Sequence, residues 1–139
     1  MREKVEVNVK KILKKDGIKN NVFNQENKLN TNIKKIIDSK LNKKNWSYRL
    51  INTKSNSATL ISQQPGEGNR RHYHSNWDEW WLIIKGMWKF EIEGKEFKLK
   101  KNDLILIKRK QKHKITAIGK TNAIRLAVSR GDVEHIYVD

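Results

Sequence analysis

Two histidines separated by one residue lie between two glycines at fixed distances, and this spacing constrains the chain more than any other feature. The series Gly66, His72, His74, Glu79 and Gly86 has five, one, four and six residues between its successive members. Alternate residues of a β-strand point to the same side, so the two histidines would project together. Imidazole nitrogens and a carboxylate oxygen suit a divalent transition metal. The series therefore predicts a metal site.

A third histidine, His113, follows 34 residues after Glu79. The apolar run 104–107 precedes it and predicts a strand, which follows the turn residues Asn102 and Asp103. A His-x-His pair on a polar strand is, by itself, most often solvated surface. The agreement of all the positions in residues 66–86, together with a distant third imidazole, favours metal binding over that interpretation.

Residues 66–86 resemble the first signature motif of the cupin superfamily at every fixed position. Residues 102–117 resemble the second motif, whose histidine is at His113. Four other positions of that motif differ, because its glycine, proline, second glycine and asparagine are here Asn102, Lys108, Lys110 and Ala117. Asparagine tolerates a positive φ angle better than most residues, so its exchange for the first glycine is mild.

The resemblance implies an all-β fold, the cupin double-stranded β-helix or jelly-roll barrel, with a metal inside its mouth. It also implies that His72, His74, Glu79 and His113 bind one divalent ion. Ligands of this type do not distinguish iron, manganese, zinc and nickel. The same set supports both Lewis-acid and redox chemistry.

From Trp46 onward, apolar and polar residues alternate in short runs with turn signals between them, such as Pro65-Gly66 and Glu93-Gly94. Many short strands at even spacing are typical of a sandwich or barrel. We therefore expect the cupin barrel to occupy residues 46–139. The expected strands are 46–50, 59–63, 81–84, 88–92, 97–99, 104–107, 114–118 and 124–129.

Residues 1–45 form a basic N-terminal extension with 13 basic and five acidic residues. Ile33, Ile36, Ile37 and Leu41 recur at helical spacing, which predicts an amphipathic helix over 31–44 with Thr31 or Asn32 as its cap. We expect this helix to dock on the outside of the barrel. A basic arm for nucleic acid, a dimer contact and partial disorder are the alternatives.

Strand alternation also predicts which residues line the cavity. Arg70 shares a face with the two motif histidines, and Trp81 shares a face with Glu79. We expect Arg70 and Trp81 to bind the substrate, with Arg70 as a clamp for a carboxylate or phosphate. The alternative for Arg70 is that it precedes the strand and points to solvent. Glu79 is the side chain that we expect to be catalytic, and His135, which matches no motif, is interpreted as surface or interface.

The opposite face of the same strand carries an apolar stripe, Trp80, Leu82 and Ile84. An apolar barrel exterior needs a cover, either the N-terminal helix or a second subunit. Cupins are commonly dimers, so the resemblance favours a homodimer.

The chain carries a net charge of +16 and has no cysteine. Such a charge favours small anionic partners, nucleic acid or a membrane surface. No stretch is apolar enough for a signal peptide or a membrane span, which indicates a cytoplasmic protein with no membrane partner. The helix at 31–44 has no clear face for reading bases, which argues against nucleic acid.

A finer resemblance concerns residues 46–50 and 126–139, which are similar to parts of the cupin domain of type II mannose-6-phosphate isomerases. It implies a sugar or phosphosugar ligand and isomerase-like activity on a small anionic metabolite. An iron-dependent dioxygenase and a non-catalytic metal- or sugar-binding cupin are the alternatives.

Overall fold

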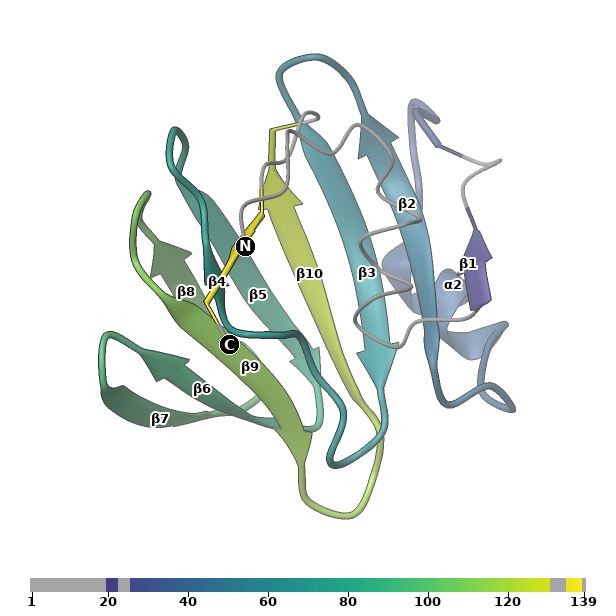
Figure 1. The fold of residues 1–139 in the computed structure, drawn as a ribbon. Coiled ribbons are helices and arrows are strands. Elements are labelled where there is room, and N and C mark those ends of the chain that lie inside the picture. Colours follow the sequence, from purple (N-terminus) through teal and green to yellow (C-terminus); the bar gives the residue numbers. More distant parts are fainter. Residues whose placement is uncertain (1–19, 23–25, 131–134, 139) are drawn as a thin grey trace.

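Two β-sheets packed face to face make up most of the chain, as Figure 1 shows. The computed structural model describes residues 20–22, 26–130 and 135–138. The six-stranded sheet has the order β1-β2-β3-β10-β5-β8, and the five-stranded sheet has the order β11-β4-β9-β6-β7. Neighbouring strands are antiparallel except for the parallel pair β1 and β2. The expected all-β double-stranded β-helix is confirmed.

The elements follow the chain in this order: β1 (Asn20–Val22), α2 (Ile33–Asp38), β2 (Trp46–Asn52), β3 (Ser57–Gln63), β4 (His72–Tyr73), β5 (Glu79–Lys85), β6 (Met87–Ile92), β7 (Lys95–Leu99), β8 (Leu104–Ile107), β9 (His113–Ile118), β10 (Ala123–Ser129) and β11 (Ile136–Tyr137). Every strand expected from alternation is present. The sequence did not predict β1 and β11, which have three and two residues and therefore no measurable periodicity.

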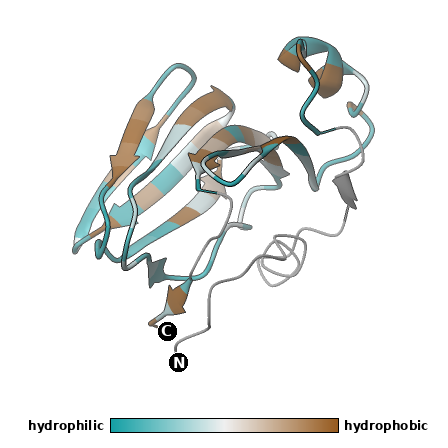
Figure 2. Cartoon of the chain, turned by 90° about the horizontal axis from the view of Figure 1, so that it is seen from above, coloured by the Kyte–Doolittle hydropathy of each residue, from teal (hydrophilic) through white to brown (hydrophobic). Residues whose placement is uncertain are grey.

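The core between the sheets consists of the inward-facing residues of both. Along β5 the buried positions are Glu79, Trp81 and Ile83, and along β9 burial alternates in the same way from the first residue onward. Apolar segments recur on the strands of both sheets in Figure 2. The buried apolar residues of this cluster are Trp81, Ile83, Trp88, Phe90, Leu99, Ile107, Ile115, Ala117 and Ala123.

Helix α2 covers part of the outer face of the six-stranded sheet. Asn32 caps it, because the side-chain Oδ1 accepts a hydrogen bond of 3.0 Å from the Lys35 backbone N–H. The expected docking on the barrel is found, although the helix is shorter than 31–44. Its residues Ile33, Ile36 and Ile37 pack against a buried cluster of the sheet that consists of Trp46, Leu50, Ala58, Leu60 and Ile124.

Two positions of the second motif adopt a left-handed backbone without glycine. Asn102 and Lys110, which replace the two glycines of the motif, have φ angles of 76° and 70°. The Lys110 backbone N–H donates to the carbonyl oxygen of His74 at 2.5 Å. This bond ties the second motif to the first, so the backbone conformation is retained although the residue type is not.

Two glycines with nearly the same φ angle give a test of this packing. Gly86 (φ 74°) would place an added Cβ only 2.8 Å from the Cα of Ala123, whereas Gly94 (φ 77°) would meet nothing within 4 Å. We expect Gly94→Ala to lower the free energy of unfolding by about 1–2 kcal/mol through the left-handed backbone alone. Gly86→Ala should cost about 1–3 kcal/mol more through overpacking.

Chemical denaturation of the two variants beside the parent measures both values. Equal losses would contradict the close approach of Gly86 to β10.

Candidate metal centre

Three histidines from the two motifs meet inside the barrel. His72 opens β4 and pairs directly with His113, the first residue of β9, while His74 directly follows β4. All three are at most 2% exposed. One ring nitrogen from each lies within 4.8 Å of the others. The structure therefore brings together the three imidazoles that the sequence selected.

Backbone carbonyls fix two of the rings in the same way. The Nδ1–H of His72 donates to the Arg70 carbonyl oxygen at 2.6 Å, and the Nδ1–H of His113 donates to the Gln111 carbonyl oxygen at 2.8 Å. A carbonyl oxygen is only an acceptor, so each Nδ1 carries the proton and each Nε2 keeps its lone pair. Such bonds orient metal-binding histidines.

Glu79 brings a carboxylate to the same place. It is the first residue of β5 and is 8% exposed. Its Oε1 lies 3.5 Å from Nε2 of His74 and 3.8 Å from Nε2 of His113. The two motifs therefore contribute three nitrogens and one carboxylate to a single buried cluster.

Burial sets the charges of these groups. Desolvation lowers the pKa of His72 well below its usual value, and the charges of the surrounding histidines lower it further. Desolvation likewise lowers the pKa of His113 to about 4, although the Glu79 charge opposes the shift. Burial alone would raise the pKa of Glu79, but the charge and hydrogen bond of His74 outweigh it and lower that pKa to about 2. At neutral pH His72 and His113 are therefore neutral imidazoles, and Glu79 is an anionic carboxylate.

This arrangement suits a divalent metal ion. Within the described ranges, Nε2 of His113 is a buried polar atom that has no hydrogen-bond partner. Two nitrogens bound to one ion at about 2.1 Å lie at most about 4.2 Å apart. The ring nitrogens here lie within 4.8 Å of one another, so small ring movements bring them to that range. Three histidines placed in this way are able to bind a metal.

The comparison with protein families agrees with the fold and the cluster. The cupin domain family matches residues 59–129. This chain is a cupin. The matched segment contains both motifs and all four residues of the cluster.

Solved structures share the fold at low sequence identity. The cupin resembles an uncharacterised protein with a double-stranded β-helix domain from Klebsiella pneumoniae, with a TM-score of 0.61 and 20% identity over 70% of this chain and 88% of that one. It also resembles an RmlC-like cupin from Methanocaldococcus jannaschii, with a TM-score of 0.55 and 24% identity over 60% and 77% of the two chains.

A sugar phosphate isomerase of the cupin superfamily from Silicibacter pomeroyi has a TM-score of 0.56 and 22% identity over 61% of this chain and 57% of its own. None of the curated proteins matches the chain.

In the part of the chain that the structure describes, no helix has the length and apolar character needed to cross a membrane.

Arg70 and Trp81 lie on different sides of the cluster. Arg70 precedes β4 and is exposed, and its guanidinium lies 4.1 Å from the centre of the Tyr137 ring. Trp81 is 2% exposed and packs edge-on against His113, with ring centres 5.7 Å apart. Arg70 is therefore exposed beside β11, and Trp81 lies in the core.

Sequence reasoning missed Arg125, a buried cation of this cupin. It is 3% exposed on β10, and its guanidinium lies 5.3 Å from the ring centre of Trp81 and 4.7 Å from that of Trp88. Its Nη1 donates to Oε1 of Gln63 at 2.7 Å. Its charge is the last of the causes that lower the pKa of His113, after desolvation and the charge of His74.

The interpretation of His135 as surface or interface is wrong. Its side chain is 8% exposed and lies against the rings of His72 and His74. No motif contains this residue, and only the pairing of β11 with β4 brings it to the cluster.

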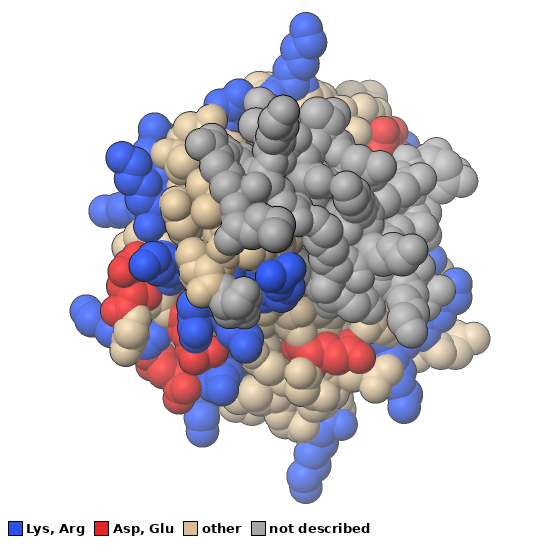
Figure 3. Space-filling view, in the orientation of Figure 1, with Lys and Arg blue, Asp and Glu red and all other residues tan. Residues whose placement is uncertain are grey.

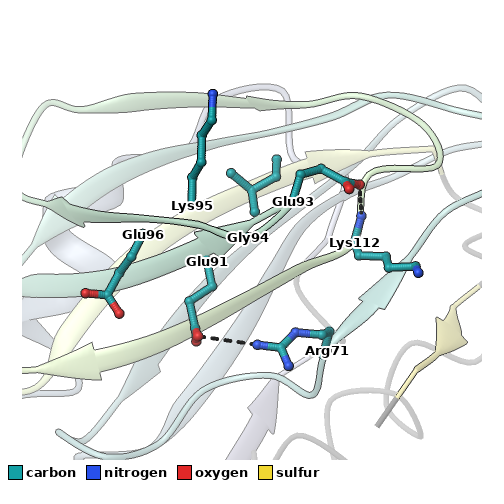
Figure 4. A pocket seen from close by; sticks show the side chains of 8 residues that line it. Arg71, Glu91, Glu93, Gly94, Lys95, Glu96 and Lys112 are labelled. Carbon is teal, nitrogen blue, oxygen red and sulfur yellow. Dashed lines mark hydrogen bonds and ion pairs between the residues drawn. The ribbon is translucent and has the colours of Figure 1, made fainter.

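A surface pocket of about 450 Å³ lies elsewhere, along the β6–β7 hairpin (Figure 4). Arg71 points toward Glu91 across it and pairs with that carboxylate at 3.3 Å, and Glu93 accepts a bond from the Lys112 backbone N–H. The charged residues that line it are three basic and three acidic, so it has no net charge to attract an anion. They are Arg71, Lys95, Lys112, Glu91, Glu93 and Glu96.

In Figure 3 basic side chains surround most of the view, and acidic side chains lie among them, several at the left and others near the lower centre and the upper right. The loop before His113 is part of this basic surface, because Lys108, Arg109, Lys110 and Lys112 are all exposed. The Arg109 backbone N–H donates to Oδ1 of Asp78 at 2.9 Å, which holds the loop beside the first motif.

Proposed function

We propose that this cupin binds one divalent metal ion through His72, His74, Glu79 and His113 and acts as an enzyme on a small anionic metabolite. The observation that carries the proposal is the buried cluster of three imidazoles and one carboxylate, two of whose rings are locked with Nε2 available. The substrate class that we favour is a sugar or phosphosugar, with isomerase-like chemistry.

Two arginines, one exposed and one buried, support an anionic ligand. Arg70 is exposed beside Tyr137, which in turn lies 5.9 Å from the His72 ring. Arg125 is buried on the inner side. A guanidinium binds carboxylate and phosphate through paired hydrogen bonds, so Arg70 suits a clamp for such a group.

One structural neighbour, the protein from Silicibacter pomeroyi, is described as a sugar phosphate isomerase, which agrees with this substrate class. A bound divalent ion would supply Lewis-acid polarisation of a substrate oxygen. The protein side chains orient that substrate, with Arg70 holding its anionic group. Glu79, anionic at neutral pH, would hold the ion, and it is the side chain that we propose as catalytic.

Elemental analysis of the purified, untagged protein tests the metal. We expect about one equivalent of a divalent ion in the parent. His72→Ala and His113→Ala should each lose it, because removal of one ligand leaves an incomplete set. Zinc or manganese would favour the isomerase, and iron would favour a dioxygenase.

The control is Glu91→Gln, which changes a carboxylate of the surface pocket outside the proposed ligand set and should keep the metal. A parent without metal, even after reconstitution, would contradict the proposed function.

Ligand binding tests the role of Arg70. We expect Arg70→Gln to weaken the binding of a hexose 6-phosphate about tenfold or more, since a hydrogen bond to a charged group contributes about 1.5–3 kcal/mol. The unphosphorylated hexose should bind both proteins alike. Calorimetric titration of the metal-loaded proteins measures the difference.

Arg71→Gln is the control, because Arg71 is the next residue along the chain and pairs with Glu91. An equal loss in both variants would mean that general surface charge, not Arg70, attracts the phosphate.

We further propose that residues 46–139 form the cupin domain and that it assembles as a homodimer through β8. In the described part of the chain, β8 is an edge strand of the six-stranded sheet. Leu104 and Leu106 are 67% and 56% exposed, and Leu106 pairs with Trp80, which is 39% exposed. An edge strand with an exposed apolar row favours pairing with another strand. A second copy presents the same strand and forms a symmetric antiparallel pair.

Light scattering of two charge variants tests the dimer. Leu104→Lys should shift the protein from dimer to monomer, because the new charge would be buried at the contact. Phe97→Lys, a change of similar exposure on β7 of the other sheet, should leave the dimer intact. A monomeric parent, or dissociation by Phe97→Lys alone, would contradict an interface through β8.

A further inference from the structure

His135 enters the barrel from the C-terminal strand. β11 pairs antiparallel with β4, with Ile136 opposite Tyr73 and Tyr137 opposite His72. Continuing this register by one residue places His135 opposite His74. Residues directly opposite in an antiparallel pair share one face of the sheet. His135 therefore projects to the same side as His72 and His74.

The ring of His135 packs against two of the three clustered histidines. It is stacked on His72, with ring centres 4.5 Å apart and planes 29° apart. It meets His74 edge to face, with centres 4.8 Å apart and planes 88° apart. Aromatic pairs at such separations are worth about 0.5–1.5 kcal/mol beyond their buried area. The side chain of His135 therefore restricts the orientation of the His72 and His74 rings.

We infer that His135 is a positioning residue of the metal centre, whose flat ring holds His72 and His74 in the orientation that binds the ion. This rests on the proposed metal function. The Nδ1 bond of His72 to the Arg70 carbonyl fixes one point of that ring, and the stack on His135 fixes its plane. Ligands that are already ordered lose less conformational entropy when the ion binds.

Packing, rather than coordination, is the role that the geometry supports. The cluster of ligand nitrogens within 4.8 Å of one another contains His72, His74 and His113 and does not include His135 among the described residues. Two of the ligands, His74 and His113, also pack against tryptophan rings. Trp77 stacks on His74 with centres 5.1 Å apart, and Trp81 packs on His113.

The inference also couples the C-terminal strand to the ion. Among the described strands, β11 pairs with β4 alone, through two residue pairs. If docking of His135 favours metal binding, metal binding must favour docking of β11 to the same extent. Loaded protein should therefore exchange the amide hydrogens of Ile136 and Tyr137 more slowly than metal-free protein does.

Cobalt(II) binding to the full chain tests the inference. His135→Phe keeps a flat ring without nitrogen, whereas His135→Ala removes the ring. We expect His135→Ala to weaken Co²⁺ binding about 10- to 100-fold, the usual range for partners of metal ligands, as measured by competition with a chelator. His135→Phe should restore the affinity to within about threefold, and its Co²⁺ absorption spectrum should match that of the parent, since the ligands are unchanged.

Val138→Ala is the control, because Val138 follows β11 and is exposed. Thermal unfolding of each metal-free protein checks that it is folded. If His135→Ala does not fold, His135→Leu, which fills the space without a flat ring, replaces it and should show the same loss.

Three outcomes overturn the inference. Unchanged affinity in the variant without the ring would show that His135 does not position the ligands. Equal loss in His135→Phe with an altered Co²⁺ spectrum would show that a nitrogen of His135 binds the ion itself. A parent that binds no Co²⁺ would overturn the proposed metal function as well, which separates the two failures.

Discussion

The direct pairing of His72 with His113 is the contact on which the site depends. β4 is only two residues long, and the pair of His72 and His113 sets the register between β4 and β9. It places two imidazoles side by side in the core, where burial of polar groups is unfavourable unless they form hydrogen bonds or bind an ion. The Nδ1 bonds to the Arg70 and Gln111 carbonyls satisfy one nitrogen of each ring. The other nitrogen of each ring remains available to bind an ion. Burial of these polar rings lowers the local stability of the core, and in return the core gains a site that can bind an ion.

Backbone hydrogen bonds explain how the second motif keeps its shape with altered residues. A lysine with a φ of 70° costs of order 1–3 kcal/mol relative to an ordinary conformation. The Lys110 N–H bond to the His74 carbonyl and the Arg109 N–H bond to Asp78 hold the turn in place and offset that cost. Since both bonds end on the first motif, the turn that precedes His113 is positioned by the segment that carries the other ligands.

The sequence predicted a feature correctly where the two-residue alternation of a strand, or one residue type at a fixed position of a motif, is enough to determine it. Alternation identified the strands, and fixed spacing selected His72, His74, Glu79 and His113, which the structure brings close together. It failed at Arg125, because on β10 the apolar residues Leu126 and Val128 alternate onto the face opposite to it. Leu126 and Val128 pack against the same buried cluster as the residues of α2, so apolar residues mark that face, and alternation alone assigns the arginine on the other face to solvent. His135 was missed for another reason, since a strand of two residues pairs through tertiary contacts that no local pattern records.

The two kinds of positive charge in this cupin act over different distances. The surface excess is screened within about 10 Å at 0.1 M salt, so it raises the rate at which anions arrive without selecting among them. Arg125 acts where water is excluded and charge interactions are several times stronger. With a divalent ion, one carboxylate and neutral imidazoles, the centre carries +1, and Arg125 adds a second positive charge nearby. For the proposed anionic ligand, changes to the exposed lysines should therefore alter association rates more than equilibrium affinity.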